Sequence, residues 1–292
     1  MRKLNRRESI IGMLLSVGAI ALGREFMSIE SPDNKKMPVL FLGHGNPMNA
    51  IQENKFTQSL NQLGENLPRP KAILMISAHW ETNGVFVTGM ERPKTIHDFG
   101  GFPKELFEVQ YPAPGAPEIA KNVSNEIEKP NIKIDINKWG LDHGTWSVLK
   151  HIFPNADVPV FQLSLDRTKP MEFHFEMGKK LKFLREQGVM IMGSGNIVHN
   201  LKEVNWKPDA KAYDWAIEFD KWVKNKIDNK NYEPLFKEAL NSQAGKLSIP
   251  TLEHYLPLLY TLGASDESDE LTYDYEGIDM SSMSMRCLRF GA

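Results

Sequence analysis

Histidines are the residues of this 292-residue chain with the most capacity for metal or acid–base chemistry. Three of the eight share one local setting, because each follows a continuous apolar run. His44 follows PVLFLG, His79 follows KAILMISA, and His199 comes shortly after VMIMGSGN. Short unbroken apolar runs are typical of strands buried on both faces of a parallel sheet. The pattern therefore places three imidazoles just beyond the carboxyl ends of three buried strands.

This shared position predicts a metal site. Loops that leave neighbouring parallel strands converge at one edge of the sheet, where α/β proteins build their ligand sites. Neutral imidazole is a good ligand for iron, zinc and copper. One such histidine is more often a structural residue, but three at one edge favour a divalent transition metal. We expect Gly43 and Gly45 to let the chain turn tightly, so that His44 faces the metal beside His79.

Two further histidines have a less regular setting. His143, in LDHGTW, is expected in a loop just before a helix, and His254, in PTLEHYLP, near the start of another. A helix N-terminus disfavours protonated imidazole, so a ligand or base role and a purely structural role both remain open. Asp142 and Glu253 are their neighbours in sequence and candidates to accept the second ring proton of a ligand histidine.

The remaining histidines carry less weight. His97 lies in the Gly-rich loop TIHDFGGFP and is a candidate to line a substrate pocket. His151 and His174 fall within expected helices. We interpret the first as a surface residue and the second as one face of a long helix.

The segments between the histidines alternate between strand-like and helix-like patterns. Strands are expected at 38–43, 71–78, 158–165 and 189–195, and helices at 55–66, 117–128, 144–152 and 170–187. From Ala210 to about Leu262 the chain looks mostly helical, a strand pair closes it near 272–290, and the Pro-rich stretch 102–117 reads as an ordered loop. The alternation predicts a single α/β domain with a central, mainly parallel sheet flanked by helices, and a metal site at the C-terminal edge of the strands.

Composition excludes several classes of function. The formal net charge is −2, so there is no basic excess to neutralise a phosphate backbone, and no nucleic-acid partner is expected. The single cysteine, Cys287, excludes an internal disulfide and a cysteine-rich metal site. There is no P-loop, GxGxxG or HExxH motif, and Ser194 lacks the flanking pattern of a hydrolase nucleophile. A homodimer is compatible with an enzyme of this size, but no stretch identifies an interface.

Residues 1–30 have the organisation of an export signal. Four basic residues precede an apolar run over 10–22, which is short for a membrane span. The pair Arg6–Arg7 resembles a twin-arginine signal, although ESII follows it rather than the usual Phe-Leu-Lys. We expect an export signal at 1–30, a catalytic domain at 31–292, and a periplasmic protein without stable membrane association once the signal is cleaved. A cytoplasmic protein, or one anchored by an uncleaved N-terminus, is the alternative.

Seven short motifs resemble, in their order, those of the LigB-like (class III) extradiol ring-cleavage dioxygenases. They are GHGNPM, SAHW, TIHDFGGFP, YPAPG, DHGTW, GSGNIVHN and PTLEHYLP, and they span roughly residues 43–257. The sequence is most similar to the bacterial 4,5-DOPA extradiol dioxygenase group, which is related to the plant betalain enzymes. The motifs are specific for the family and much less so for the substrate.

The resemblance implies a mononuclear non-haem iron(II) site, which zinc(II) can occupy in a purified protein. It implies that His44 and His79 are metal ligands, and that His254 replaces the ligand glutamate of the protocatechuate-cleaving relatives. His199 matches a histidine that is either a further ligand or the acid/base, and His143 matches an active-site histidine near the substrate. The implied substrates are a small, DOPA-like catechol and dioxygen. An all-histidine site carries less negative charge than one with a carboxylate, so its metal preference need not follow the relatives.

Two other functions would use the same histidines. One is a zinc-dependent hydrolase, because zinc on such ligands activates water. The other is a non-enzymatic metal-binding protein on the same scaffold. Dioxygen uptake with ring cleavage after loading with iron(II) distinguishes a dioxygenase from both.

Overall fold

Residues 36–207 and 210–291 are described by a computed structural model. The export-signal prediction for residues 1–30 lies outside them. Within the described ranges no helix is long and apolar enough to cross a membrane.

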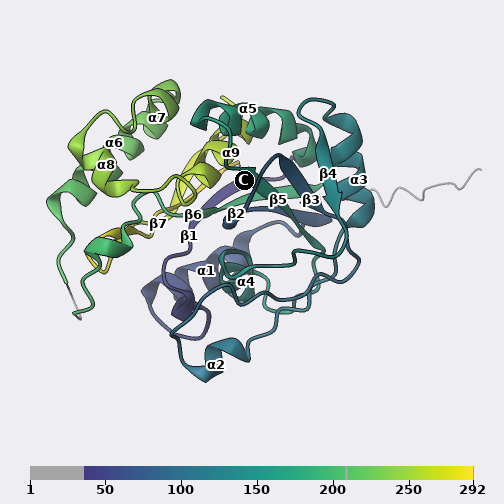
Figure 1. The fold of residues 1–292 in the computed structure, drawn as a ribbon, viewed down its shortest axis with the longest axis horizontal. Helices are drawn as coiled ribbons and strands as arrows, with labels where there is room; N and C mark the ends of the chain where they lie inside the picture. The colour runs from purple at the N-terminus through teal and green to yellow at the C-terminus, as the bar shows by residue number, and fades with distance from the viewer. Residues whose placement is uncertain (1–35, 208–209, 292) are drawn as a thin grey trace, which may run out of the picture. The chain divides into compact units, whose positions relative to one another are not determined.

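A mixed eight-stranded sheet lies between two layers of helices (Figure 1). Its order is β4-β3-β5-β2-β6-β1-β10-β7. The four central strands run parallel to one another: β5 (Val160–Asp166), β2 (Ala72–Thr82), β6 (Val189–Gly195) and β1 (Val39–Gly43). They correspond to the four predicted strands, and the prediction of a mainly parallel sheet is confirmed.

The flanks of the sheet contain its antiparallel pairs. On one flank β3 (Val85–Thr88) is antiparallel to β5 and parallel to the edge strand β4 (Ile132–Asp135). On the other, β10 (Cys287–Phe290) is antiparallel to both β1 and β7 (Leu271–Tyr275), which gives the expected last strand pair. A separate two-stranded hairpin joins β8 (Ile278–Asp279) and β9 (Met283–Ser284). The sequence did not predict β3 and β4, which are short and carry partly exposed or charged side chains.

Alternate side chains of the central strands enter two different cores. In β1, Val39 and Phe41 belong to one core, whereas Leu40 and Leu42 belong to the other. Successive side chains of a strand point to opposite faces, so a strand covered on both sides must be apolar throughout. This explains the unbroken apolar runs in the sequence.

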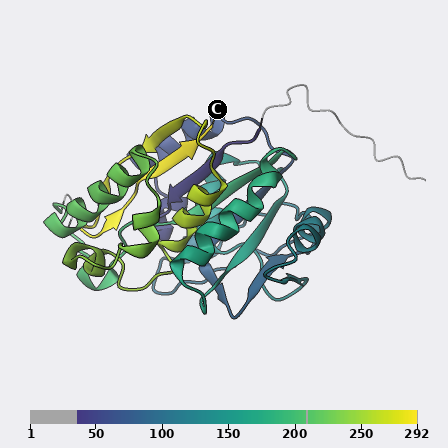
Figure 2. The same ribbon diagram turned by 90° about the horizontal axis from the view of Figure 1, so that it is seen from above.

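The helices divide between the two faces of the sheet, as the two views show (Figures 1 and 2). One core includes α1 (Lys55–Asn66) and α4 (His143–Ile152). The other includes α3 (Pro117–Glu126), α5 (Met171–Leu181) and α9 (Leu256–Ala264). It is extended by α6 (Asp214–Asp228), α7 (Glu233–Lys237) and α8 (Gln243–Ser248). The predicted helical stretch from Ala210 to Leu262 is thus confirmed.

The predicted helix boundaries differ only at their ends. The helix expected at 144–152 begins one residue earlier, at His143, and that expected at 170–187 is α5 followed by a 3-10 turn over Lys182–Arg185. The stretch 102–117 is ordered as expected, but it contains a short helix, α2 (Lys104–Phe107).

His174 is fully buried in the packing between α5 and α9. Its Nδ1 lies 3.1 Å from the hydroxyl of Tyr260. Among the described residues its Nε2 has no hydrogen-bond partner. Burial disfavours the charged imidazolium and lowers the pKa of His174 to about 4.

Acid should therefore destabilise the fold through His174. In the unfolded chain histidine takes up a proton below about pH 6.5, whereas the native residue stays neutral down to about pH 4. The free energy of unfolding should fall as the pH decreases through this window, with a contribution from His174 on the order of 3 kcal/mol. Urea unfolding of chelator-treated protein between pH 7 and pH 4.5 measures this, and His174→Gln should flatten the dependence. An equally steep dependence in the variant would contradict the assignment.

Candidate metal centre

Five of the eight histidines meet at the carboxyl edge of the central strands. They come from five separate parts of the fold: the end of β1, the second half of β2, the start of α4, the loop that follows β6 and the turn that precedes α9. These are His44, His79, His143, His199 and His254. The convergence that the sequence predicted is observed.

Two glycines position His44, in different ways. Gly45 has a φ of +60°, a left-handed conformation that makes the turn after β1 and favours glycine. At Gly43, by contrast, a Cβ would lie 2.8 Å from the backbone carbonyl carbon of Met285. The prediction of a tight turn holds for Gly45. For Gly43 it was wrong, because this glycine permits the close approach of a neighbouring backbone.

His79 lies inside a distorted part of β2. Ile76 is opposite Leu163 and Glu81 is opposite Leu165, so β2 carries extra residues over this interval. Such bulges redirect side chains and are frequent beside active sites. The sequence placed His79 beyond the end of its strand, but β2 continues to Thr82 and the irregularity gives His79 its direction.

Hydrogen bonds define which nitrogen of His44 carries the proton. Its Nδ1 lies 2.9 Å from the hydroxyl of Ser194, which donates its own proton to the carbonyl oxygen of Gly144 at 2.5 Å. A hydroxyl has only one proton, so Ser194 must accept from His44. His44 is therefore protonated at Nδ1 and has its lone pair at Nε2.

Carboxylates likewise favour a proton on Nδ1 in two other rings, those of His254 and His79. Glu253 Oε1 accepts a hydrogen bond from His254 Nδ1 at 3.0 Å, and Asp98 Oδ2 lies 3.2 Å from His79 Nδ1. An ionised carboxylate can only accept, so both histidines carry their proton at Nδ1. The prediction that Glu253 partners His254 is confirmed.

Asp142 has a different role from the one considered above. It caps α4, where Oδ1 accepts from the backbone N–H of Thr145 and from the hydroxyl of Ser77. Its Oδ2 accepts from the side-chain amide of Gln162. Asp142 is thus no partner of an imidazole in the described structure. Its two oxygens already accept hydrogen bonds from the start of α4 and from side chains of β2 and β5. The carboxylate beside His143 is Asp98, which the sequence did not single out.

The three rings with a free Nε2 are neutral. Burial, followed by the neighbouring histidines, holds the pKa of His44 and of His254 well below the usual value, and burial lowers the pKa of His79 to about 3. The Nε2 atoms of His44 and His79 lie 3.1 Å apart. With both Nδ1 protons engaged, two lone pairs face each other at this distance. A cation held between them would remove that repulsion, so the donor set fits a metal ion.

The distances between ring centres indicate which histidines could bind one common ion. Rings bound to one ion through nitrogens about 2.1 Å away have centres about 3.2 Å from it, so at angles of 90–110° they lie about 4.6–5.3 Å apart. The rings of His44, His79 and His254 are separated by 5.0, 5.3 and 5.1 Å. His143 is only 3.8 Å from His79, and His199 is 3.5 Å from His254. The separations among the first three are those expected around one ion, and the donor atoms of His44, His79 and His143 also lie within 4.8 Å of one another.

His199 is stacked almost parallel to His254, with an angle of 8° between their planes. It is half-buried, and burial lowers its pKa to about 4, so the ring is neutral at neutral pH. A neutral imidazole with access to open space can accept a proton. His199 and His254 also form, with Glu253, a second group of converging donor atoms.

His97 belongs to an aromatic cluster beside His143. Its Nε2 donates to the carbonyl oxygen of Val109 at 2.9 Å, and its ring packs 5.5 Å from that of Trp146. Phe99 connects the cluster to the site, with its ring 5.4 Å from His143. His97 thus lies one layer behind the histidines. His151 lies on α4 away from them, and its Nε2 donates to the carbonyl oxygen of Asn49.

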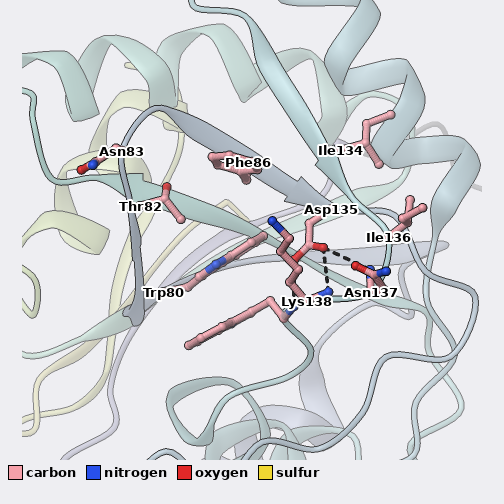
Figure 3. A pocket seen from close by; sticks show the side chains of 10 residues that line it. Trp80, Thr82, Asn83, Phe86, Ile134, Asp135, Ile136, Asn137 and Lys138 are labelled. Atoms are coloured by element: carbon pink, nitrogen blue, oxygen red, sulfur yellow. Dashed lines mark hydrogen bonds between the residues drawn. The ribbon is translucent and has the colours of Figure 1, made fainter.

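A separate cavity of about 440 Å³ is lined by residues of β2, β3, β4 and the turn after β4 (Figure 3). Trp80 and Trp139 stack there with parallel rings 5.7 Å apart, and Phe86 and Lys138 complete its walls. None of the site histidines lines it. Trp80, which lines this cavity, directly follows His79 in β2.

Comparison with known proteins decides the family. Residues 38–285 match the family described as "Catalytic LigB subunit of aromatic ring-opening dioxygenase". The chain belongs to the LigB family of dioxygenases. The 4,5-DOPA dioxygenase extradiol of Escherichia coli (strain K12) is 48% identical over 259 residues, which cover 88% of this chain and 95% of that protein. The 4,5-DOPA dioxygenase extradiol of Beta vulgaris is 36% identical, over 89% of this chain and 98% of its own.

A crystal structure of an uncharacterized protein from Escherichia coli K12 is also similar to this LigB-family chain. The TM-score is 0.78 at 44% sequence identity, and the match covers 88% of this chain and 100% of that one. The resemblance drawn from the seven motifs is confirmed. This LigB-family protein is therefore an extradiol ring-cleavage dioxygenase rather than a hydrolase or a non-enzymatic metal-binding protein.

Proposed function

We propose that this dioxygenase opens the ring of a small, DOPA-like catechol at an iron(II) centre held by His44, His79 and His254. The observation that carries the proposal is the convergence of three neutral imidazoles whose Nδ1 atoms each lie 2.9–3.2 Å from a hydroxyl or carboxylate oxygen. The names of the bacterial and plant relatives support DOPA as the kind of catechol. Zinc(II) fits the same nitrogen ligands and is the expected occupant after purification without iron.

Bound iron(II) would supply the Lewis acidity that favours a deprotonated catechol and the redox capacity that dioxygen chemistry requires. The protein supplies the orientation, because the Nδ1 partners of its ligands fix each ring before the metal arrives. Because these ligand rings are already oriented, they need not rotate into place during the reaction.

We assign His199 as the acid/base. An imidazole lone pair lies in the plane of its ring, so two rings stacked in parallel 3.5 Å apart cannot both direct lone pairs at one ion. With His254 as ligand, His199 keeps a ring nitrogen for the substrate. This nitrogen would accept a proton from a catechol hydroxyl and later return it to the opening ring. His143, whose ring lies 3.8 Å from that of His79, would face the substrate as well.

Phe99 is the aromatic residue that we expect to pack against the catechol ring, because its own ring lies 5.4 Å from that of His143. Phe99→Ala should raise KM for a catechol about tenfold with kcat nearly unchanged, since an aromatic contact contributes about 0.5–1.5 kcal/mol beyond the area that it buries. Phe86→Ala is the matched control, because this phenylalanine lines the other cavity. Steady-state kinetics at fixed dioxygen measures both. A larger effect of Phe86→Ala would place the substrate in the cavity of Figure 3 instead.

Product analysis tests the proposed function. The iron(II)-loaded protein is mixed anaerobically with L-DOPA, catechol or protocatechuate, and ¹⁸O₂ is then admitted. We expect DOPA to give a ring-opened product that gains both labelled atoms, and the other catechols to react more slowly. A product that lacks the label, or a preference for protocatechuate, would contradict the proposal.

We also propose that the protein is exported to the periplasm by its twin-arginine-like N-terminus. Support comes from the basic residues and the apolar run of residues 1–30 alone. Cell fractionation and N-terminal sequencing of the mature protein test this, with Arg6→Lys together with Arg7→Lys as the blocked control. Intact protein in the cytoplasm of wild-type cells would contradict it.

A further inference from the structure

One carboxylate contacts two histidines of the site. Asp98 Oδ2 lies 3.2 Å from His79 Nδ1 and 2.9 Å from His143 Nδ1, and both are close electrostatic contacts rather than straight hydrogen bonds. Asp98 Oδ1 accepts a hydrogen bond from the backbone N–H of His143 at 2.9 Å. The side chain of Asp98 is only 16% exposed. The carboxylate is thus anchored to the start of α4 while it faces both rings.

These contacts determine where both rings carry their protons. A lone pair on either Nδ1 would face a carboxylate oxygen at about 3 Å, so electrostatic repulsion favours a proton on each Nδ1. A neutral imidazole protonated at Nδ1 has its lone pair at Nε2. His79 then offers Nε2 to a metal, and the neutral form of His143 offers Nε2 to whatever binds beside it.

No other described carboxylate is placed to do this. Asp142, next to His143 in sequence, has its oxygens occupied by Ser77, Thr145 and Gln162. Glu253 is bonded to His254 on the other side of the site.

We propose that Asp98 is a positioning residue that fixes the tautomers of His79 and His143 together. It thereby couples a metal ligand to a histidine on the substrate side through one shared group. The inference rests on the proposed function for the roles of the two histidines, but the tautomers themselves can be measured without metal, substrate or turnover.

The substitution Asp98→Asn is informative because an amide has one oxygen where the carboxylate has two. That oxygen can accept from the backbone of His143 or face the two rings, but it cannot do both. The amide nitrogen would then turn a donor toward the Nδ1 atoms or toward the helix start. Asp98→Glu keeps both oxygens on a longer side chain and serves as the conservative variant. Glu105→Gln, on the exposed part of α2, is the matched control for loss of one negative charge.

Nitrogen-15 NMR of the imidazoles provides the test, in the metal-free and the zinc(II)-loaded full chain. We expect His79 and His143 to be protonated at Nδ1 in the wild type, and His143 in Asp98→Asn to show the Nε2–H tautomer in a substantial fraction. Zinc(II) affinity, measured by chelator competition, should fall about 10–100-fold in Asp98→Asn and recover partly in Asp98→Glu. Glu105→Gln should match the wild type in both measurements.

Two results would overturn the inference. The first is an Nε2–H tautomer of either histidine in the wild type, which needs no variant and so does not depend on whether Asp98→Asn folds. The second is a folded Asp98→Asn protein with unchanged tautomers and unchanged zinc(II) affinity, which would reduce Asp98 to a loop anchor. Absence of catechol turnover with the expected tautomers would instead count against the proposed function alone.

Discussion

His44→Ala and His79→Ala should each abolish binding of the metal and leave no measurable ring cleavage. Each substitution removes a neutral nitrogen that faces the other at 3.1 Å. Replacement of a residue that hydrogen-bonds to a metal ligand typically lowers metal affinity about 10–100-fold. We therefore expect loss of a direct ligand to lower it by more than about 100-fold. Metal content per chain, measured after anaerobic loading with iron(II) and desalting, should fall from one to near zero.

His151→Ala is the control for these two substitutions. His151 is a half-buried histidine of α4 that binds a backbone carbonyl and stands apart from the site. Its variant should retain one metal per chain and normal turnover. If His44→Ala and His79→Ala also kept one tightly bound metal, the assignment of the centre would be wrong.

His199→Gln should separate metal binding from turnover. Glutamine retains a polar side chain against the face of His254 but cannot take up a proton. Because positioned acid–base groups contribute about 10²–10⁴-fold, we expect kcat to fall by that factor while metal content stays at one per chain. Metal analysis and single-turnover kinetics on the same loaded sample measure both quantities.

The comparison with His254→Ala makes this division of roles specific. These two rings stack on each other, yet only loss of His254 should remove the metal. His143→Ala should resemble His199→Gln, with metal retained and turnover lost. A metal-free His143→Ala or His199→Gln protein would show that the replaced histidine is itself a metal ligand.

The sequence predicted the parts of the site that depend on strand order alone. His44 and His199 follow apolar runs, and parallel strands bring their carboxyl ends to one edge whatever the details of packing. Adjacency in sequence also made Glu253 a candidate partner of His254, although the same argument was wrong for Asp142 and His143. These features are local, so a single sequence contains the information for them.

Features that depend on long-range packing were not predictable in this way. Asp98 reaches His79 and His143 only because the loop after residue 95 folds back onto the start of α4. The bulge in β2 arises from its register against β5, which no local pattern around His79 reveals. His174 was taken as one face of a helix, but its burial depends on α9, more than eighty residues later in the chain.

Simultaneous recording of dioxygen uptake and product absorbance is the most direct test of iron-dependent ring cleavage at this site. Chelator-treated protein is loaded anaerobically with iron(II), and air-saturated DOPA is added in an oxygen electrode fitted with an optical path. We predict one dioxygen consumed for each yellow ring-opened product, and no uptake with His44→Ala. Firmly bound metal without dioxygen uptake across a panel of catechols would contradict ring cleavage at this centre.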